Sequence, residues 1–370
     1  MNDVASAPVP NAERLAEEIF TGLRSALEIL AVDIGVRRGL YEALAAHGPM
    51  TPRDLSKTAG IHARYAREWL EQQAVAGVLI ASGPAASGPV HDDYERRYEL
   101  PAEHRRVLLD RDDPFYLATG PQFIASIAEA LPEVLEAFGT GGGVPYERYG
   151  EGTREGIAGL NRPMFQPVTL HSWVAALPDV HRRLSEAPGA QVLDLGCGLG
   201  WSTIALARAF PEARLTGIDL DAASIEQARR NAEEAGLGER IAFVRTDAAG
   251  AGLDGAVDLV TVFEALHDMA DPIGVLASVR GLLSPSGAVL IGDEKVSEEF
   301  TAPGPELDRL NYAFSLLHCL PATRAEGAKV EAGTVLRPAT VRAYAHDAGY
   351  GSVQVLDIEH DLWRFYRLSP

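Results

Sequence analysis

The stretch Val192–Gly200 constrains the fold of this chain more than any other part of the sequence. It reads VLDLGCGLG, an apolar strand that runs into three glycines in the spacing G-x-G-x-G. Glycine suits a turn between a strand and a helix where the backbone comes close to a ligand, because a Cβ would collide there. The dinucleotide fingerprint G-x-G-x-x-G would need a glycine at Trp201. The spacing therefore favours an α/β domain that binds an adenosine ligand without a pyrophosphate.

Acidic residues follow the next two strands that the sequence predicts. The strand 214–218 leads into Asp219, and the strand 241–246 leads into Asp247 and Ala248. A carboxylate about 20 residues beyond such a glycine turn can accept hydrogen bonds from ribose hydroxyls. Asp247 and the backbone N–H of Ala248 suit the amino edge of an adenine. We expect the three strand ends to converge on one nucleoside; the alternative is that the acids only cap helices.

The stretch from about Asn161 to Leu368 resembles the class I S-adenosylmethionine-dependent methyltransferases. The resemblance implies a Rossmann-like domain with a seven-stranded sheet and S-adenosyl-L-methionine as the cofactor, with Asp194 and Gly196 near its methionine part. The segment Leu160–Met164 is similar to a phenylalanine-asparagine-x-glycine-methionine segment of plant-type O-methyltransferases, with proline in place of the glycine. The implied cofactor-binding residues are Met164, Asp194, Gly196, Gly198, Asp219, Leu220, Asp247, Ala248 and Phe263.

Length and composition predict a cytoplasmic protein of more than one domain. A length of 370 residues exceeds the size at which a single hydrophobic core usually stops growing. Residues 1–18 lack the apolar core of a secretion signal, and no run of about 18 apolar residues suggests a membrane span. The chain has only 2 cysteines, which favours a reducing compartment and argues against a disulfide framework or a zinc site.

Capping signals and apolar spacing predict a mainly helical winged-helix domain over residues 15–109. The segment Thr51–Asp54 carries a capping threonine, a proline suited to a first helical turn and an acid three residues after the cap. A second helix follows, with Ile61 and Trp69 on one face. The segments 78–81 and 98–100 are the expected strands of the wing.

A winged helix can bind DNA, but its charge favours another role here. Residues 1–105 contain 11 Lys and Arg against 15 Asp and Glu, and the whole chain has a net charge of −19, which leaves little to neutralise phosphates. The domain resembles the N-terminal domain of small-molecule O-methyltransferases, and the phrase Arg64–Leu70 is especially similar to a bacterial branch of them. That resemblance implies a homodimer paired through the winged helix, and nucleic acid is a disfavoured partner.

The catalytic residue that the sequence predicts is His267, in the loop Phe263–Met269 after the strand 257–262. Ligands of an open parallel sheet bind outside the carboxyl ends of its strands. An imidazole there could accept the proton of a hydroxyl, because it titrates near neutrality; alternatively, His267 only caps a helix. The run Leu266-His267-Asp268 resembles the catalytic loop of plant-type O-methyltransferases, with methionine where those enzymes have tryptophan.

A carboxylate that orients the predicted base should come from the end of the next strand. The strand 288–292 leads into Asp293 and Glu294. By the resemblance, Asp293 stands where related enzymes carry a supporting glutamate, and Glu294 remains a competitor because the aspartate arm is shorter. Two acids at one strand end could also hold Mg²⁺, but that ion usually takes ligands from several converging positions, so we expect no metal.

Together these features predict a methyltransferase domain over residues 186–370, joined to the winged helix by a helical, pocket-lining segment over residues 110–185. The expected reaction is methylation of a small molecule, chiefly on oxygen of a hydroxylated metabolite. Carbon or nitrogen methylation stays open, as does a non-catalytic regulator that binds the cofactor and uses the winged helix on DNA. The resemblance to small-molecule methyltransferases implies that a helix over 306–319 roofs the pocket, and its Ser315, His318 and Cys319 either touch substrate or have a structural role.

Overall fold

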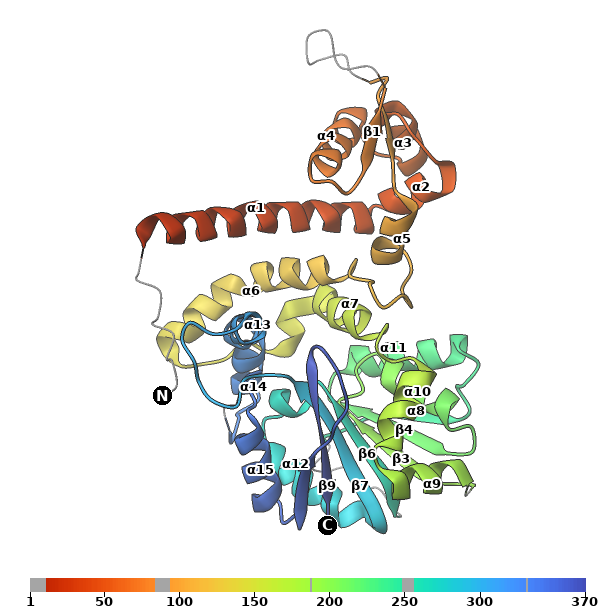
Figure 1. The fold of residues 1–370 in the computed structure, drawn as a ribbon, viewed down its shortest axis with the longest axis vertical. Coiled ribbons are helices and arrows are strands. Elements are labelled where there is room, and N and C mark those ends of the chain that lie inside the picture. The colour runs from red at the N-terminus through yellow and green to blue at the C-terminus, as the bar shows by residue number, and fades with distance from the viewer. Residues whose placement is uncertain (1–10, 84–93, 187, 248–255, 331) are drawn as a thin grey trace, which may run out of the picture. The chain divides into compact units, whose positions relative to one another are not determined.

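A computed structural model describes residues 11–83, 94–186, 188–247, 256–330 and 332–370. The chain divides into two compact units (Figure 1). The first comprises Met1–Ala125 with Glu155–Pro163, and the second comprises Ser126–Arg154 with Met164–Pro370.

The first unit has the helices and the two-stranded wing that the sequence predicts. The capping box is present: the Thr51 hydroxyl accepts from the Asp54 N–H at 3.2 Å, and the Asp54 carboxylate accepts from the Thr51 N–H at 3.2 Å. The wing strands pair antiparallel, with Ala81 opposite Tyr98. The elements are α1 (Ala12–Arg37), α2 (Leu40–His47), α3 (Pro52–Ala59), α4 (Ala63–Val75), β1 (Ile80–Ser82), β2 (Arg97–Glu99) and α5 (Ala102–Leu108).

Helices occupy most of the chain between the wing and the sheet. The boundary between the two units falls inside two of them, α6 and α7. The elements are α6 (Gly120–Thr140), η1 (Tyr146–Tyr149), α7 (Gly150–Asn161), α8 (Pro167–Ala175) and α9 (Pro178–Glu186).

The second unit contains one seven-stranded sheet in the order β5-β4-β3-β6-β7-β9-β8, which confirms the predicted fold class. The first five strands of that order are parallel, and β9 runs antiparallel to both β7 and β8. The strands are β3 (Gln191–Leu195), β4 (Arg214–Asp219), β5 (Ile241–Arg245), β6 (Val257–Phe263), β7 (Leu283–Glu294), β8 (Ser352–Val355) and β9 (Trp363–Ser369).

Helices cover both faces of the sheet. Alternate residues of each strand point to opposite faces, so each strand packs against both helical layers. Val192 and Leu259 pack with α8, α9, α10 (Trp201–Ala209) and α11 (Ala222–Glu234). Leu193 and Val260 pack with α12 (Pro272–Leu282) and α15 (Pro338–Asp347). Figure 1 shows these two helical layers on either side of the strands. The carboxyl ends of the parallel strands are thereby left as the place where side chains can meet a ligand.

The predicted helix over 306–319 is α-helical only in its first part. It consists of α13 (Glu306–Phe314) and a π-helical turn, η4 (Ser315–Cys319), and it continues as α14 (Leu320–Ala325). Single π-helical turns inside helices are rare and are often found at functional sites. No helix in the described residues is both long and apolar enough to cross a membrane.

Candidate active site

The glycine turn after β3 leaves room for a ligand and is tied to the next strand. Gly198 has φ +50°, and a Cβ on it would meet no atom within 4 Å. Its N–H donates to Asp219 Oδ2 at 2.9 Å, and Asp219 Oδ1 accepts from the Asp221 N–H at 2.9 Å. Burial raises the pKa of Asp219, and these backbone donors oppose that rise. The carboxylate is thus held at the tip of β4 beside the open turn, as a ribose-binding acid requires.

Gly196 closes the other side of the turn. It has φ +67°, and a Cβ there would lie 2.5 Å from the Ala265 Cβ in the loop after β6. Glycine therefore allows the ends of β3 and β6 to approach each other. A larger residue would push apart two of the strand ends that form the site.

The carboxylate of Asp194 is held by three hydroxyl groups of the protein. Its Oδ2 accepts from the hydroxyls of Ser202 and Thr203, each at 2.6 Å, and its Oδ1 accepts from the Thr261 hydroxyl at 2.7 Å. Burial raises the pKa of Asp194, against the effect of the three hydroxyls. In this structure Asp194 braces β3, β6 and the start of α10, while its contact with the methionine part of the cofactor stays a prediction. The three hydroxyl partners were not anticipated from the sequence.

The remaining predicted cofactor residues differ in their surroundings. Met164 is half-buried against the core, and Phe263 is buried and stacked on Trp363 with ring centres 6.1 Å apart. Leu220 and Asp247 are exposed beyond the ends of β4 and β5. Ala248 lies outside the described residues. The structure therefore brings most of this set to the carboxyl edge of the sheet, and the individual contacts with the cofactor stay predictions.

His267 forms a buried pair with Asp293. The His267 Nδ1 lies 2.7 Å from Asp293 Oδ1, and the two residues are 2 % and 1 % exposed. The Glu294 N–H also donates to Asp293 Oδ1, at 2.9 Å. Burial alone would lower the pKa of His267, but the carboxylates of Asp293 and Asp268 hold that pKa well above its usual value. The shorter aspartate arm does reach the histidine.

The competitor Glu294 pairs with a different residue. Its carboxyl group hydrogen-bonds to that of Glu264, and burial followed by the charge of Glu264 raises the pKa of Glu294 well above its ordinary value. Glu264 has φ +50° and is the one non-glycine residue with positive φ in the described part of the chain. The sequence reasoning missed Glu264 as a site residue; its place directly after β6 was the available signal.

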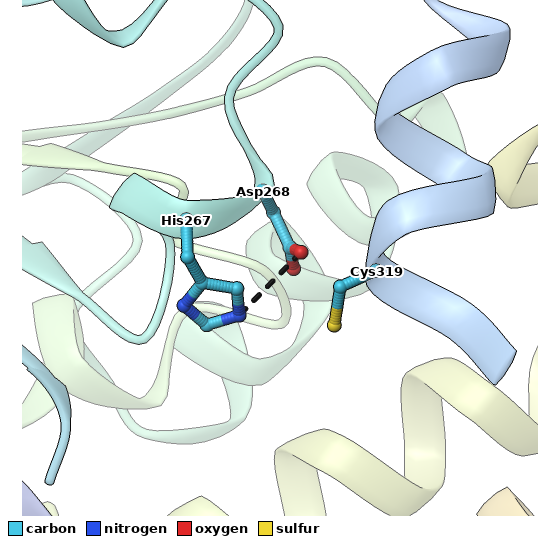
Figure 2. A group of neighbouring side chains, drawn as sticks. All are labelled: His267, Asp268 and Cys319. Atoms are coloured by element: carbon cyan, nitrogen blue, oxygen red, sulfur yellow. Dashed lines mark ion pairs between the residues drawn. The ribbon is translucent and has the colours of Figure 1, made fainter. Parts of the chain in front are cut away.

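The Nε2 edge of the His267 ring lies beside Asp268 of the same loop, and the ring also meets Cys319 of the π-helical turn. His267 Nε2 lies 3.4 Å from Asp268 Oδ1 (Figure 2). The ring also hydrogen-bonds to Cys319. Burial raises the pKa of the Cys319 thiol to about 12. Beside it, His318 Nδ1 lies 3.5 Å from Cys319 Sγ. The structure therefore brings His318 and Cys319, two of the predicted roof residues, to the loop that carries His267.

Aromatic rings from η1 complete these surroundings. His318 lies edge-on to Tyr149 and Tyr146, with ring centres 4.6 Å and 5.7 Å apart, and the Tyr149 hydroxyl donates to the Leu317 carbonyl at 2.9 Å. The carboxylates of Asp219, Asp221 and Asp268 all act on the buried hydroxyl of Tyr146, whose pKa is raised chiefly by burial. Tyr146 therefore stands near both Asp219 and the loop that carries His267.

A parallel sheet with a glycine turn at β3, an acid at the end of β4 and a buried histidine–aspartate pair at β6 and β7 defines a nucleoside-cofactor enzyme of the α/β class. Comparison with known proteins gives the family. Residues 186–329 match the family described as "Methyltransferase domain", and residues 25–111 match the "Rv2258c-like winged HTH domain". The chain therefore contains a methyltransferase domain that follows a winged-helix domain.

Individual relatives are similar to part or all of the chain. An uncharacterised 37.1 kDa protein of transposon Tn4556 from Streptomyces fradiae is 35% identical over 131 residues, which cover 34% of this chain and 36% of that protein. The match thus spans about a third of that relative's length. The structure of the mitomycin 7-O-methyltransferase MmcR has a TM-score of 0.68 at 21% identity and covers 97% of this chain and 98% of its own.

A further structural relative carries the cofactor. Human N-acetylserotonin methyltransferase, solved in complex with SAM, has a TM-score of 0.67 at 17% identity and covers 98% of this chain and 99% of its own. At such low identity the two solved structures show the shared fold. The human enzyme is solved with SAM, and in this chain the open turn at Gly198 with the carboxylate of Asp219 beside it fits a molecule of that kind.

Proposed function

We propose that this protein methylates a hydroxyl oxygen of a small metabolite, with His267 as the general base. The observation that carries the proposal is the buried contact of His267 with Asp293 at the carboxyl ends of β6 and β7. Ligands of such a sheet bind at this edge. Bound S-adenosylmethionine supplies an electrophilic methyl group. The turn at Gly198 and the carboxylate of Asp219 would hold that cofactor.

Asp293 and His267 act together in the proton transfer. In the neutral form of His267, an Nδ1–H donated to Asp293 leaves the Nε2 lone pair for the substrate hydroxyl, so Asp293 is a positioning residue that fixes the ring and its tautomer. The raised pKa of His267 means that this neutral form gains population as the pH rises. The same carboxylate stabilises the imidazolium once the proton has moved. A base of this kind contributes about 10²- to 10⁴-fold, and orientation of the reactants contributes more, about 7 kcal/mol or above.

Residues of the second unit favour a small, partly aromatic substrate. Tyr146, Tyr149 and His318 present ring edges and faces beside the His267 loop, and Cys319 faces the histidine itself. Aromatic rings of this kind bind flat apolar molecules while a few polar groups fix their orientation. The name of the structural relative MmcR, a 7-O-methyltransferase, supports oxygen as the acceptor atom.

The first unit supports a homodimer rather than contact with DNA. Helix α1 exposes large apolar side chains along its length, with Phe20, Leu23 and Leu27 being 70%, 60% and 69% exposed. The same unit contains a cavity of about 540 Å³ lined by residues such as Ile34, Tyr65 and Trp69. Exposed apolar surface of this extent is typical of a protein interface. We therefore propose that two copies pair through this unit, in the cytoplasm, where the two free buried cysteines stay reduced.

The test is a turnover assay with product analysis. The purified protein is incubated with S-adenosylmethionine that carries a ¹³C-labelled methyl group. The acceptors are a panel of phenols, alcohols, amines and compounds with an acidic C–H bond. We expect a methyl ether as the product. His267→Ala should lower turnover by about 10²- to 10⁴-fold and leave the calorimetric affinity for the cofactor nearly unchanged.

Two results would decide against the proposal. Full activity of His267→Ala across neutral pH would remove the general base and favour carbon or nitrogen methylation of a substrate that is already nucleophilic. Tight binding of a DNA duplex at moderate salt, together with no turnover on any acceptor, would favour a non-catalytic regulator.

A further inference from the structure

Three potential metal ligands converge on the face of His267 that is turned away from Asp293. Nε2 of His267, a carboxylate oxygen of Asp268 and Sγ of Cys319 all lie within 4.8 Å of one another. Figure 2 shows His267 and Asp268 on one short segment and Cys319 on the facing helix. Two separate parts of the fold, the loop after β6 and the π-helical turn η4, therefore supply the three groups.

The spacing of these atoms approaches that of a tetrahedral zinc site. Zinc binds nitrogen and oxygen ligands at about 2.0–2.2 Å and sulfur at about 2.3 Å, so neighbouring ligand atoms lie about 3.4–3.5 Å apart. His267 Nε2 and Asp268 Oδ1 already have this separation, at 3.4 Å. Because all three atoms lie within 4.8 Å of one another, Cys319 Sγ has to approach the other two by at most about 1.4 Å.

The Oδ1 atom of Asp268 faces His267 and makes no hydrogen bond in the described residues. It is buried, and its carboxylate stands at ion-pair distance from His267. Buried polar atoms without a hydrogen bond are uncommon and are often explained by an ion or water that binds them.

The contact of His267 with Asp293 is a second feature expected of a metal site. A histidine that binds zinc nearly always donates its other ring N–H to a carboxylate or carbonyl, which orients the ring and makes the ligand more basic. His267 Nδ1 meets Asp293 Oδ1 at 2.7 Å, and both side chains are almost fully buried. The pair that supports a general base is thus also the arrangement that supports a zinc-binding histidine.

We propose that His267, Asp268 and Cys319 bind Zn²⁺ and that this binding reversibly inhibits the enzyme. The ion takes the Nε2 lone pair that the substrate hydroxyl needs, and one position of the tetrahedron stays open. On coordination the Nε2 proton of protonated His267 and the proton of the Cys319 thiol both pass to solvent. The inhibition rests on the proposed function, but the metal binding does not. A set of one nitrogen, one oxygen and one sulfur favours Zn²⁺ over Mg²⁺, which takes oxygen ligands.

The few cysteines of the chain are compatible with this site. Structural zinc sites use several cysteines, and the sequence has only Cys197 and Cys319. A site with three protein ligands and one open position needs a single thiolate. The second cysteine, in the glycine turn, provides a matched control.

The binding test uses Co²⁺ as a spectroscopic substitute for Zn²⁺ in the full-length protein. After treatment with a chelator, the protein is titrated with Co²⁺ while its absorption is recorded. We expect one ion per chain, a thiolate-to-cobalt charge-transfer band and the strong visible bands of tetrahedral Co²⁺. The charge-transfer band should disappear in Cys319→Ser and Cys319→Ala and should persist in Cys197→Ser.

Two further variants test the other members of the site. Asp293→Asn should weaken Co²⁺ binding by about 10- to 100-fold, the loss typical of a group that supports a metal ligand. Asp268→Asn should weaken it at least as much, because it alters a direct ligand. Circular dichroism and calorimetric binding of the cofactor verify that each variant is folded.

The inhibition test follows turnover with the hydroxylated acceptor. Zn²⁺ should inhibit in competition with the acceptor and not with the cofactor, Mg²⁺ at the same concentration should not inhibit, and a chelator should restore activity. Absence of the charge-transfer band, or its loss in Cys197→Ser instead of Cys319→Ser, would overturn the metal site. Co²⁺ binding with the expected band but with undiminished turnover would support the metal site and contradict the general base.

Discussion

The most informative single change is Asp293→Asn, because it removes the charge of the carboxylate and keeps the shape of the side chain. Asp293 Oδ1 faces two donors, His267 Nδ1 at 2.7 Å and the Glu294 N–H at 2.9 Å. The amide oxygen of asparagine should therefore take the place of Oδ1 and preserve both hydrogen bonds. The amide nitrogen then takes the place of Oδ2, which has no hydrogen-bond partner among the described residues. The ring orientation and tautomer of His267 should survive.

The expected loss is the stabilisation of the imidazolium by a full charge. A hydrogen bond to a charged group contributes about 1 to 2 kcal/mol more than a neutral one. Two unit charges about 4 Å apart at an effective dielectric constant near 20 interact by about 4 kcal/mol, which is an upper bound. Because about 1.4 kcal/mol corresponds to a factor of ten, we predict that turnover falls by roughly 5- to 1000-fold.

The assay compares turnover at saturating cofactor and acceptor with the calorimetric affinity for the cofactor. Glu294→Gln is the matched control, because Glu294 pairs with Glu264 and should affect turnover less than tenfold. Wild-type turnover in Asp293→Asn, together with a large loss in Glu294→Gln, would refute the assignment of Asp293 and restore Glu294 as the supporting acid.

Three further predictions concern other parts of the molecule. Asp219→Ala should weaken cofactor binding by about 10- to 100-fold in calorimetry, since about 1.5–3 kcal/mol is lost with each hydrogen bond to a charged group, while turnover at saturating cofactor changes little. The double variant Leu23→Glu and Leu27→Glu should be monomeric in sedimentation velocity, where the unchanged protein is expected to be dimeric; a dimeric variant would contradict pairing through α1. Because the pKa of Glu294 is raised in the folded state, its contribution to stability is complete below the ordinary glutamate pKa and is lost as the pH rises through the raised value. Glu264→Gln should reduce that loss in urea unfolding measured from pH 5 to 8, and an unchanged pH dependence would contradict the pairing of Glu264 with Glu294.

Local sequence signals were sufficient to predict the sheet and the ends of its strands. The glycine turn at Gly196–Gly200 and the apolar run of β6 depend on residues that are close in the chain, and each marks a strand without reference to the rest of the fold. The capping box at Thr51 is local in the same sense. The predicted fold class and the winged-helix domain are both confirmed.

Contacts between distant residues could not be predicted in this way. Thr261 donates to Asp194 across 67 residues because the two stand opposite each other on paired parallel strands, and no spacing rule in the sequence marks that contact. Cys319 reaches His267 because a π-helical turn interrupts the expected α-helix. Apolar spacing is nearly the same for a helix with or without such a turn, so the sequence does not reveal it.

The meeting of His267 with Asp293 follows from strand register and one unusual backbone angle. Phe263 at the end of β6 stands opposite Gly292 on the parallel neighbour β7, so Asp293 lies one residue beyond that level. His267 lies four residues beyond it and would overshoot if the chain ran straight on. The φ of +50° at Glu264 turns the chain at the first residue after the strand, and its N–H still donates to the Gly292 carbonyl at 2.8 Å. A non-glycine residue in this region costs about 1–3 kcal/mol of strain, which the surrounding contacts must offset. The strain is thus located at the residue that brings the base back to its carboxylate.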